Sequence, residues 1–589
     1  MRLRHLAYFS LIFTAFVLLS ACRNEPKLPV VAEDTEVNVR ISGDPSGLNP
    51  LLNYDNVATQ TMGLIFAPLM KYSSKTYELE PVLVKSLPKK EEVNSGDKKG
   101  LIAFTYEILE EAVWDDGTPI TGNDFDFTIK AAYNPNYRSP YPSFFAFIEE
   151  VEVNGENPKQ FTVYTKKYFL ANAVLGTVNM MPSHRLDPNN IYADYSLADF
   201  KSKEMKEKLA SDEQLKQAAS LFTSPKMMGQ DGALAGSGAY TLVNWEEGQS
   251  LRLERKENWW GDKINSQVIV ANPKKITFKI VPDFNAARSL FRNGELDIMS
   301  SIGINDFQNL KEDAFFKENY NFYAPSIIAH RTVIMNNSDT RLSDKSVRKA
   351  LAHLLDLEEI FDVVYLGVKN PVVSPIHPSK PYYRKDLQPI DFNIDKAKNL
   401  LKEAGWTDSD NNGILDKTID GELKELDFKI SFSGKFNDYR NIAQIFKEDA
   451  KQAGVNIRLT PLDSRPLQTG WKQKDFDLSF LPFIWQPLHK NLRQRWHSES
   501  SGNYVSFATV ETDKIIDEID QTVDEDKLAE LYKRFQEIFY EEQPVIFINT
   551  ASNHIMASKK FGNITTSAIP PIYYVNQLKQ VTVPNFSNN

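Results

Sequence analysis

The chain is nearly devoid of cysteine. Cys22 is the only one among its 589 residues, so the remainder of the chain can form no internal disulfide. The stability of the folded body must therefore come from packing. A chain of this length exceeds what one hydrophobic core supports, which predicts two or more lobes.

Long hydrophobic runs are also scarce. The one clear run extends from Leu6 to Leu19 and follows two basic residues, Arg2 and Arg4. As a helix its roughly 14 residues would span about 21 Å, which is less than a ~30 Å hydrocarbon core. The run is therefore interpreted as a secretory signal, and the body after it is expected to be soluble.

The signal ends in Leu19-Ser20-Ala21-Cys22, which resembles a bacterial lipobox. That resemblance implies cleavage before Cys22 and acylation of its thiol, with a signal peptide over 1–21 and a polar tether over 22–36. A plain signal peptide with an incidental cysteine is the alternative. We expect a periplasmic or cell-surface protein anchored by this lipid.

A strong charge of one sign is absent as well. The 68 basic and 78 acidic residues are mixed along the chain and leave a formal net charge of −10. A nucleic-acid partner would require a clustered basic face, so none is expected. The chain contains no Gly-x-Ser-x-Gly elbow and no His-Glu-x-x-His helix, which argues against an enzyme, although paired carboxylates leave a glycosidase open.

Strand and helix patterns alternate along the chain, which indicates mixed α/β lobes. Period-two alternation predicts strands at 37–41 and 276–281. Apolar residues at helical spacing, several followed by glycine, predict helices at 286–293, 347–355, 394–404, 442–453 and 527–540.

Several short segments occur in a characteristic order: Gly47-Leu48-Asn49-Pro50, Trp114-Asp115-Asp116-Gly117-Thr118-Pro119, Gly236-Ser237-Gly238-Ala239-Tyr240, Asn293-Gly294-Glu295-Leu296-Asp297 and Glu403-Ala404-Gly405-Trp406. Together they resemble the family 5 extracellular solute-binding proteins, the dipeptide and oligopeptide binding type of ABC importers. Locally, Asp116-Gly117 predicts a turn, and the residues from Thr121 predict a helix start.

The resemblance implies an α/β fold of the two-lobed periplasmic-binding-protein type (type II, cluster C) with an inserted subdomain. Lobe I is expected to combine 37–56, 236–325 and 545–589, the insertion to cover 57–235, and lobe II to cover 326–544. Crossovers between the lobes are expected near 329–336 and 544–548. Closure of the lobes by hinge motion would remove a small ligand from water.

The resemblance also implies ligand contacts from both lobes. In lobe I these are Tyr54, Asp55 and Asn56, and in lobe II they come from the segment around Trp485, Gln486 and His489, with Trp496 and Tyr504 as possible walls. Core packing is the alternative for Trp496. Peptide-binding relatives usually carry an aspartate shortly after the tryptophan, where this chain has Gln486-Pro487-Leu488-His489-Lys490. Because a buried ammonium without a carboxylate is costly, either another acid such as Asp55 replaces it or the ligand is not a free-amine peptide.

One loop has part of a calcium-binding pattern. Asp408, Asp410 and Asn412 alternate and Gly413 is sixth, but position twelve is Ile419 rather than a bidentate glutamate. Asp416 could complete a weak site, and a polar turn without metal is favoured. No metal or cofactor is expected.

The function expected from these features is that of a lipid-anchored, monomeric binding protein that delivers a small solute, expected to be a peptide, to an ABC permease in the inner membrane. A solute sensor, or a binder of an oligosaccharide or metal chelate, is the alternative. A secreted hydrolase is the least favoured interpretation.

Overall fold

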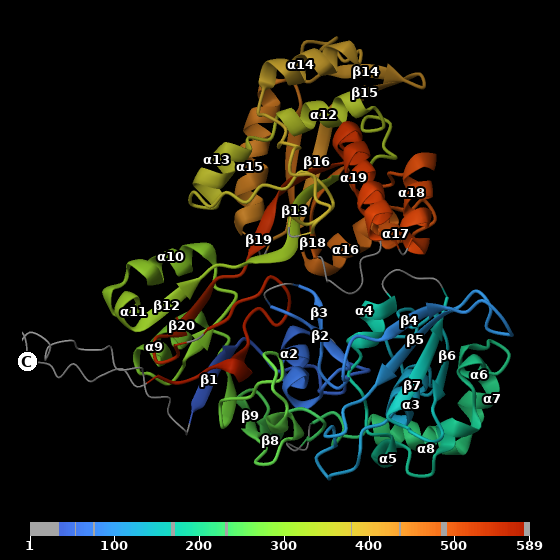
Figure 1. Cartoon of the computed structure of the whole chain (residues 1–589). Coiled ribbons are helices and arrows are strands. Elements are labelled where there is room, and N and C mark those ends of the chain that lie inside the picture. Colours follow the sequence, from blue (N-terminus) through green and yellow to red (C-terminus); the bar gives the residue numbers. More distant parts are fainter. Residues whose placement is uncertain are drawn as a thin grey trace, which may run out of the picture.

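A computed structural model describes residues 35–581, apart from 54, 75–76, 167–170, 230–233, 379, 435–436, 485–491, 523 and 563. Sheets of seven, five and four strands organise these residues. The five-stranded sheet and its helices form the upper body in Figure 1, and the other two sheets form the lower part. This arrangement confirms the expected mixed α/β, two-lobed fold class.

The seven-stranded sheet brings together segments that are far apart in sequence. Its first strand runs parallel to one that begins 239 residues later, with Val37 opposite Ile276. Val37 and Val39 are fully buried and alternate with more exposed residues, as expected for a strand with one face on a core. In sheet order the strands are β12 (Tyr320–Tyr323), β20 (Ile555–Ser558), β11 (Ile298–Met299), β1 (Glu36–Ile41), β10 (Lys275–Ile280), β9 (Ser250–Arg255) and β8 (Tyr240–Glu246).

Three helices pack against one end of this sheet. Phe291, Phe307 and Phe316 share a hydrophobic cluster with Met299 and Met556 of the strands. The helices are α9 (Phe284–Arg292), α10 (Ile304–Glu312) and α11 (Ala314–Asn319).

The five-stranded sheet has a separate hydrophobic core on each face. Along one strand, Val545 and Phe547 belong to one cluster, and Ile546 and Ile548 belong to the other. Because successive side chains point to opposite faces, a strand buried on both sides is apolar throughout. In sheet order the strands are β17 (Asn456–Leu462), β16 (Asp427–Ser433), β18 (Leu478–Ile484), β13 (Ser326–Met335) and β19 (Val545–Ser552).

Helices cover both faces of this sheet. On one side lie α12 (Lys345–His353), α13 (Leu357–Glu359), the π-helix η3 (Ile360–Val364), α14 (Ile394–Glu403) and α15 (Asn437–Gln452), with the hairpin β14 (Asp416–Ile419) and β15 (Glu422–Glu425) beyond α14. On the other side lie α16 (Ser464–Gln473), α17 (Leu492–Trp496), α18 (Val510–Gln521) and α19 (Glu525–Glu542). The helices expected near 347, 394, 442 and 527 are all confirmed.

The four-stranded sheet is β4 (Lys89–Glu92), β5 (Ile102–Glu107), β7 (Gln160–Thr165) and β6 (Ile148–Val153), in that order. It shares one continuous hydrophobic cluster with β1, β8, β9 and β10 of the seven-stranded sheet. The lower part is therefore one packed unit. Besides α9, α10 and α11, the lower part contains α2 (Asn56–Ile65), α3 (Gly122–Ala132), α4 (Ala171–Gly176), α5 (Ser183–Leu186), α6 (Leu197–Lys201), α7 (Lys206–Ser211) and α8 (Glu213–Phe222), together with the short hairpin β2 (Met70–Tyr72) and β3 (Leu79–Pro81).

The corner expected after Trp114 is confirmed. The Trp114 N–H donates to Thr118 O at 2.8 Å, and Gly117 adopts a φ of +85° that suits a glycine in a turn. Asp124, in the first turn of α3, accepts the Thr121 N–H at 2.9 Å. The segment from Trp114 to Pro119 is therefore a structural corner with a capped helix behind it.

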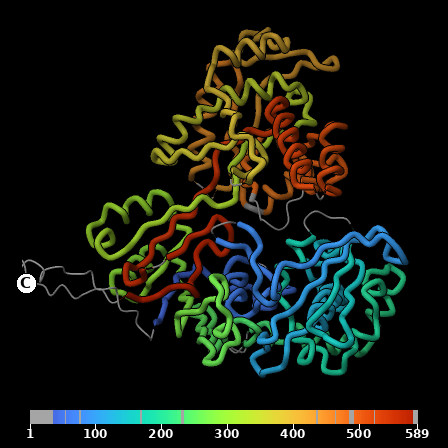
Figure 2. Tube along the Cα trace, in the orientation of Figure 1, coloured from blue at the N-terminus to red at the C-terminus, as the bar shows by residue number. Residues whose placement is uncertain are grey.

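Two neighbouring strands carry the chain between the bodies. β12 pairs with β20 in the lower sheet, and β13 pairs with β19 in the upper sheet, both antiparallel. Figure 2 shows the green and red segments rising together into the upper body. The crossing points are therefore 324–325 and 553–554, between the paired strands.

This finding corrects the expected crossovers at 329–336 and 544–548, which lie inside β13 and β19. It also shows that a lobe I segment starting at 545 would divide the five-stranded sheet, because β19 hydrogen-bonds to β13. An apolar strand covered by helices on both faces belongs to the sheet that buries it, so we assign lobe II to 326–552 and the last segment of lobe I to 553 onward. The other expected boundaries stay a proposal.

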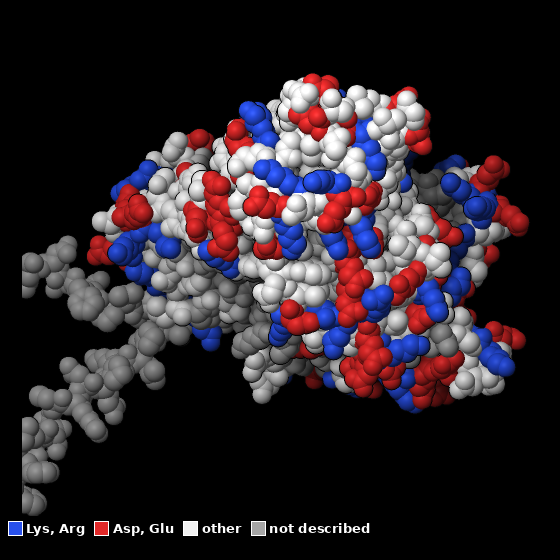
Figure 3. Space-filling model, turned by 90° about the horizontal axis from the view of Figure 1, so that it is seen from above, with Lys and Arg blue, Asp and Glu red and all other residues white. Residues whose placement is uncertain are grey.

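The described part of the chain includes no helix that is both long and apolar enough to span a bilayer. On the face shown in Figure 3, basic and acidic side chains are interspersed. This distribution agrees with the mixed charge of the sequence.

Candidate functional site

The carboxyl ends of three parallel strands define the candidate site. β16 runs parallel to both β17 and β18, so Ser433, Leu462 and Ile484 end at the same edge of the upper sheet. In open α/β sheets this edge is where ligands bind. The edge lies on the side of the upper body that faces the lower part, beside α16 (Figure 1).

Tyr54, Trp485, Gln486 and His489 lie outside the described residues, as does Cys22. Of the segment expected to line the ligand, β18 is described up to Ile484, the residue before Trp485. The structure therefore places the beginning of this segment at the edge of the upper sheet that forms the candidate site. The ligand contacts of the segment stay a prediction.

Asp55 acts as the N-cap of α2. One carboxylate oxygen accepts the Ala58 N–H at 2.9 Å, and the other accepts the Ser46 N–H at 2.9 Å and the Ser46 hydroxyl at 2.5 Å. Burial alone would raise the pKa of Asp55, but these hydrogen bonds outweigh it and lower the pKa. Both carboxylate oxygens therefore have partners within the lower body, which gives Asp55 a structural role, and its contact with a ligand ammonium stays a prediction. Asn56, the first residue of α2, is exposed.

Trp496 is a core residue of the upper body. Its side chain is only 4% exposed, and its ring centroid lies 5.2 Å from that of Phe483 and 4.6 Å from that of Phe539. This packing favours the core alternative over a ligand wall, so we remove Trp496 from the proposed contacts. Tyr504 packs at the margin of the same cluster, with the Arg495 guanidinium 5.5 Å from its ring centre.

A groove of about 590 Å³ runs between α16 and the outer face of β16 and β17. It begins near the candidate edge, at Leu462 and Arg465, and extends along α16 to Asp477. Asp477 accepts hydrogen bonds from Arg341 at 2.9 Å and from the Lys429 N–H at 2.8 Å, so its charge is already paired. Sequence reasoning missed this groove, because it depends on how α16 packs over strands that are distant in sequence.

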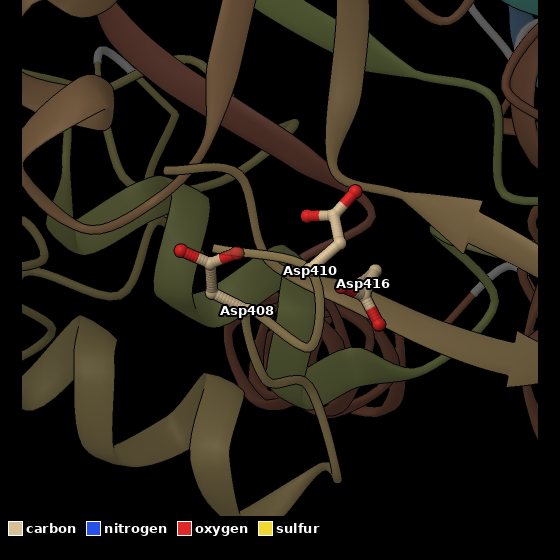
Figure 4. Close-up of side chains that lie close together, drawn as sticks. All are labelled: Asp408, Asp410 and Asp416. Atoms are coloured by element: carbon tan, nitrogen blue, oxygen red, sulfur yellow. The ribbon is translucent and has the colours of Figure 1, made fainter. Parts of the chain in front are cut away.

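Figure 4 shows the carboxylates of Asp408, Asp410 and Asp416, which have oxygens within 4.8 Å of one another. Asp416 is buried and accepts the N–H and the hydroxyl of Ser409, both at 2.8 Å. Asp408 accepts the N–H groups of Asn412 and Gly413, both at 3.0 Å. The loop thus satisfies these carboxylates with its own donors, as the polar-turn interpretation requires. No other group of this kind occurs in the described residues.

Two packed bodies joined by a strand pair, with a ligand-binding edge facing the junction, define the class of two-lobed solute-binding proteins. The model of the bacterial extracellular solute-binding proteins, family 5 Middle, matches residues 78–502, which is more than half of the chain. The protein belongs to this family.

Curated relatives agree with this assignment. The oligopeptide-binding protein AppA of Bacillus subtilis is 22% identical over 564 residues, which cover 93% of this chain and 94% of that protein. The nickel-binding periplasmic protein of Escherichia coli is 24% identical over 371 residues, which cover 62% of this chain and 68% of that protein.

Solved structures share the fold at low identity. The Bacillus subtilis AppA complex with a nonapeptide gives a TM-score of 0.67 at 21% identity and covers 94% of this chain and all of that one. NikA from Brucella suis with Fe(III)-EDTA gives 0.73 at 19% identity, with 93% and 100% coverage. The periplasmic EDTA-binding protein EppA gives 0.74 at 18% identity, with 94% and 98% coverage.

Proposed function

We propose that this solute-binding protein captures short peptides between its two lobes and delivers them to an ABC permease. The observation that supports this most is the candidate edge itself, where three parallel strands of lobe II end opposite the lower body. Curated relatives named for oligopeptides or dipeptides match 76–96% of this chain, which favours peptides as the solute class.

The binding step follows from the division into two bodies. A solute held at the edge of lobe II becomes desolvated when the lower body closes over it, and closure is favoured to the extent that the solute binds the closed form more tightly. Trp485 and Gln486 are proposed to contact the solute from lobe II, and Tyr54 and Asn56 from lobe I.

A metal chelate is the second candidate, and one sequence feature favours it. Where peptide-binding relatives usually carry an aspartate, this chain has His489 and Lys490, which suit an anionic ligand better than an ammonium group. The fold is also shared with proteins solved with Fe(III)-EDTA and Ni(L-His).

Mass spectrometry of solute released from natively purified protein separates the two candidates. The peptide proposal predicts a mixture of short peptides without associated metal. Release of a metal chelate or of an oligosaccharide alone would contradict it.

We further propose that a lipid on Cys22 tethers the protein to a membrane, with residues 22–36 as the spacer. The Cys22→Ser variant is expected to leave the membrane fraction, because it lacks the thiol that carries the acyl chain. Membrane retention equal to that of the unmodified chain would contradict the tether.

A further inference from the structure

The β2–β3 hairpin of the lower body contacts a hydrophobic cluster of lobe II. Tyr72 and Tyr77 pack against this cluster, which includes Ile328 on β13 and Ile376 in the loop before Tyr382. Both tyrosines are partly buried. The hairpin therefore makes a contact between the bodies that is separate from the strand pair through which the chain crosses.

The C-terminal loop of the lower body joins the same contact. Ala568 and Ile569 are buried members of the cluster, and the Ile328 N–H donates to Ala568 O at 2.9 Å. A hydrogen bond within the loop stabilises its turn, because the Ser567 N–H donates to Ile572 O at 2.7 Å. Apolar packing and a backbone hydrogen bond thus connect lobe II to a loop that is 240 residues away from β13 in sequence.

The backbone of Tyr77 is in an unusual conformation. Its φ of +59° lies in the left-handed region, which bulky side chains rarely adopt. Such a conformation persists where surrounding contacts compensate for its cost. At Tyr77 these contacts include the packing of its ring against the cluster between the bodies and the Tyr77 N–H, which donates to Ser73 O at 3.1 Å.

Charged groups contribute to the same contact. Burial lowers the pKa of Lys380 in lobe II, and the carboxylate of Glu78 in the hairpin opposes that shift. Burial raises the pKa of Tyr72, with Glu78 and the Tyr382 hydroxyl adding to the effect. Glu78 thus acts electrostatically on Lys380, and Tyr382 on Tyr72, between the hairpin and lobe II.

We propose that Tyr72, Tyr77 and Glu78 of the hairpin, together with Ala568 and Ile569, form a latch that keeps the lobes from opening beyond the arrangement seen here and so favours closure of the solute site. The strand pair at 324–325 and 553–554 allows rotation, and the latch restricts it. The effect on solute affinity rests on the proposed binding function, whereas the effect on lobe separation does not.

The test measures the distance between spin labels on the two bodies by pulsed EPR. In the full chain carrying Cys22→Ser, the Lys89→Cys and Lys514→Cys changes provide the only thiols, and both lysine side chains are exposed, at 71% and 76%. Lys89 is on β4 and Lys514 is on α18, in different bodies (Figure 1). The unmodified latch predicts a single narrow distance distribution in the solute-free protein.

The Tyr72→Ala/Tyr77→Ala variant is expected to broaden this distribution toward longer distances and to weaken solute binding by about tenfold. The matched control is Tyr164→Ala, which removes a partly buried tyrosine within the four-stranded sheet and should change neither quantity. A folded double variant with an unchanged distance distribution would overturn the latch.

The Glu78→Lys variant supplies an independent test, because Glu78 is exposed and its replacement leaves the hydrophobic core intact. Like charges at positions 78 and 380 should broaden the distribution at low salt, and about 1 M salt should reverse the effect. An unchanged distribution at low salt would count against the latch. If the distance distribution of the Glu78→Lys variant broadens but the unmodified protein binds no peptide, the latch is supported and the peptide proposal is contradicted.

Discussion

Asn553 holds Ser301 at the point where the chain returns from lobe II to the lower sheet. The Asn553 side-chain oxygen accepts the Ser301 N–H at 2.9 Å, and its amide nitrogen lies 3.3 Å from the Ser301 hydroxyl. The neighbouring His554 ring nitrogen lies 3.0 Å from Ile302 O. One end of the proposed hinge is therefore fixed to the lower body by side-chain hydrogen bonds.

The Asn553→Ala change should loosen this attachment. Loss of the bonds to Ser301 is expected to lower the free energy of local opening by about 1–2 kcal/mol and to speed amide exchange at 300–303 and 553–555. Hydrogen-exchange mass spectrometry measures this directly, with the exposed Asn293→Ala as control. Equal exchange in the variant and the unmodified protein would show that these bonds do not anchor the hinge.

Asp449 on α15 should make stability depend on pH. Burial, with Glu359, Asp356 and Glu448 adding to it, raises the pKa of Asp449 to about 6, above the ordinary aspartate value. The folded state therefore favours the neutral acid, and the resulting stability is fully present below about pH 4 and is lost as the pH rises through about 6.

The Asp449→Asn variant should accordingly be more stable than the unmodified protein at pH 8, by about 1–2 kcal/mol, with little difference near pH 4. Urea unfolding at both pH values measures the change, and the exposed Asp395→Asn serves as control. A stabilisation that is the same at both pH values would contradict the titration of Asp449.

Trp496 and Trp485 should respond differently to truncation. Trp496→Ala empties a core position and is expected to cost about 3–5 kcal/mol of stability without changing solute affinity under conditions where the protein is folded. Trp485→Ala should lower affinity at nearly unchanged stability. Urea unfolding measures the stability of each variant, and calorimetric titration measures its solute affinity. A Trp496→Ala variant that loses affinity at unchanged stability would show that Trp496 contacts the ligand.

The Asp416→Ala change should destabilise the loop around it irrespective of calcium. Two donors of Ser409 lose their acceptor, at a cost of about 1–3 kcal/mol. The melting temperature should fall equally in calcium and in a chelator. A rise of the melting temperature with calcium that Asp416→Ala abolishes would instead identify a cation site.

Local signals in the sequence predicted much of lobe II. The helical spacing of apolar residues before Gly405 and Gly454 predicted α14 and α15. Both glycines have the positive φ that is expected beyond a helix end, +84° and +77°. The pairing of β1 with β10, in contrast, joins segments that are far apart, and local periodicity carries no information about it. The predicted crossover positions were wrong for the same reason. The apolar sequence of β19 does not indicate to which sheet the strand belongs, and only its pairing with β13 identifies that sheet.

The site was harder to predict than the fold. Asp55 immediately precedes an apolar-periodic segment, and this N-cap signal could have identified its structural role. The burial of Trp496 depends on Phe539, a partner 43 residues away, so sequence alone left both roles open. The latch combines residues near 72 and 568 that pack against Ile328 of lobe II, and only the folded chain brings these segments together.

Small-angle X-ray scattering of the protein with and without its native solute tests whether the two lobes close over the solute. Removal of the solute by unfolding, followed by refolding, gives the free form for comparison. Lobe closure predicts a smaller radius of gyration in the solute-bound protein, because the bodies rotate toward each other about 324–325 and 553–554. Mass spectrometry verifies that the two samples differ in solute content. Superimposable scattering curves from such samples would contradict lobe closure.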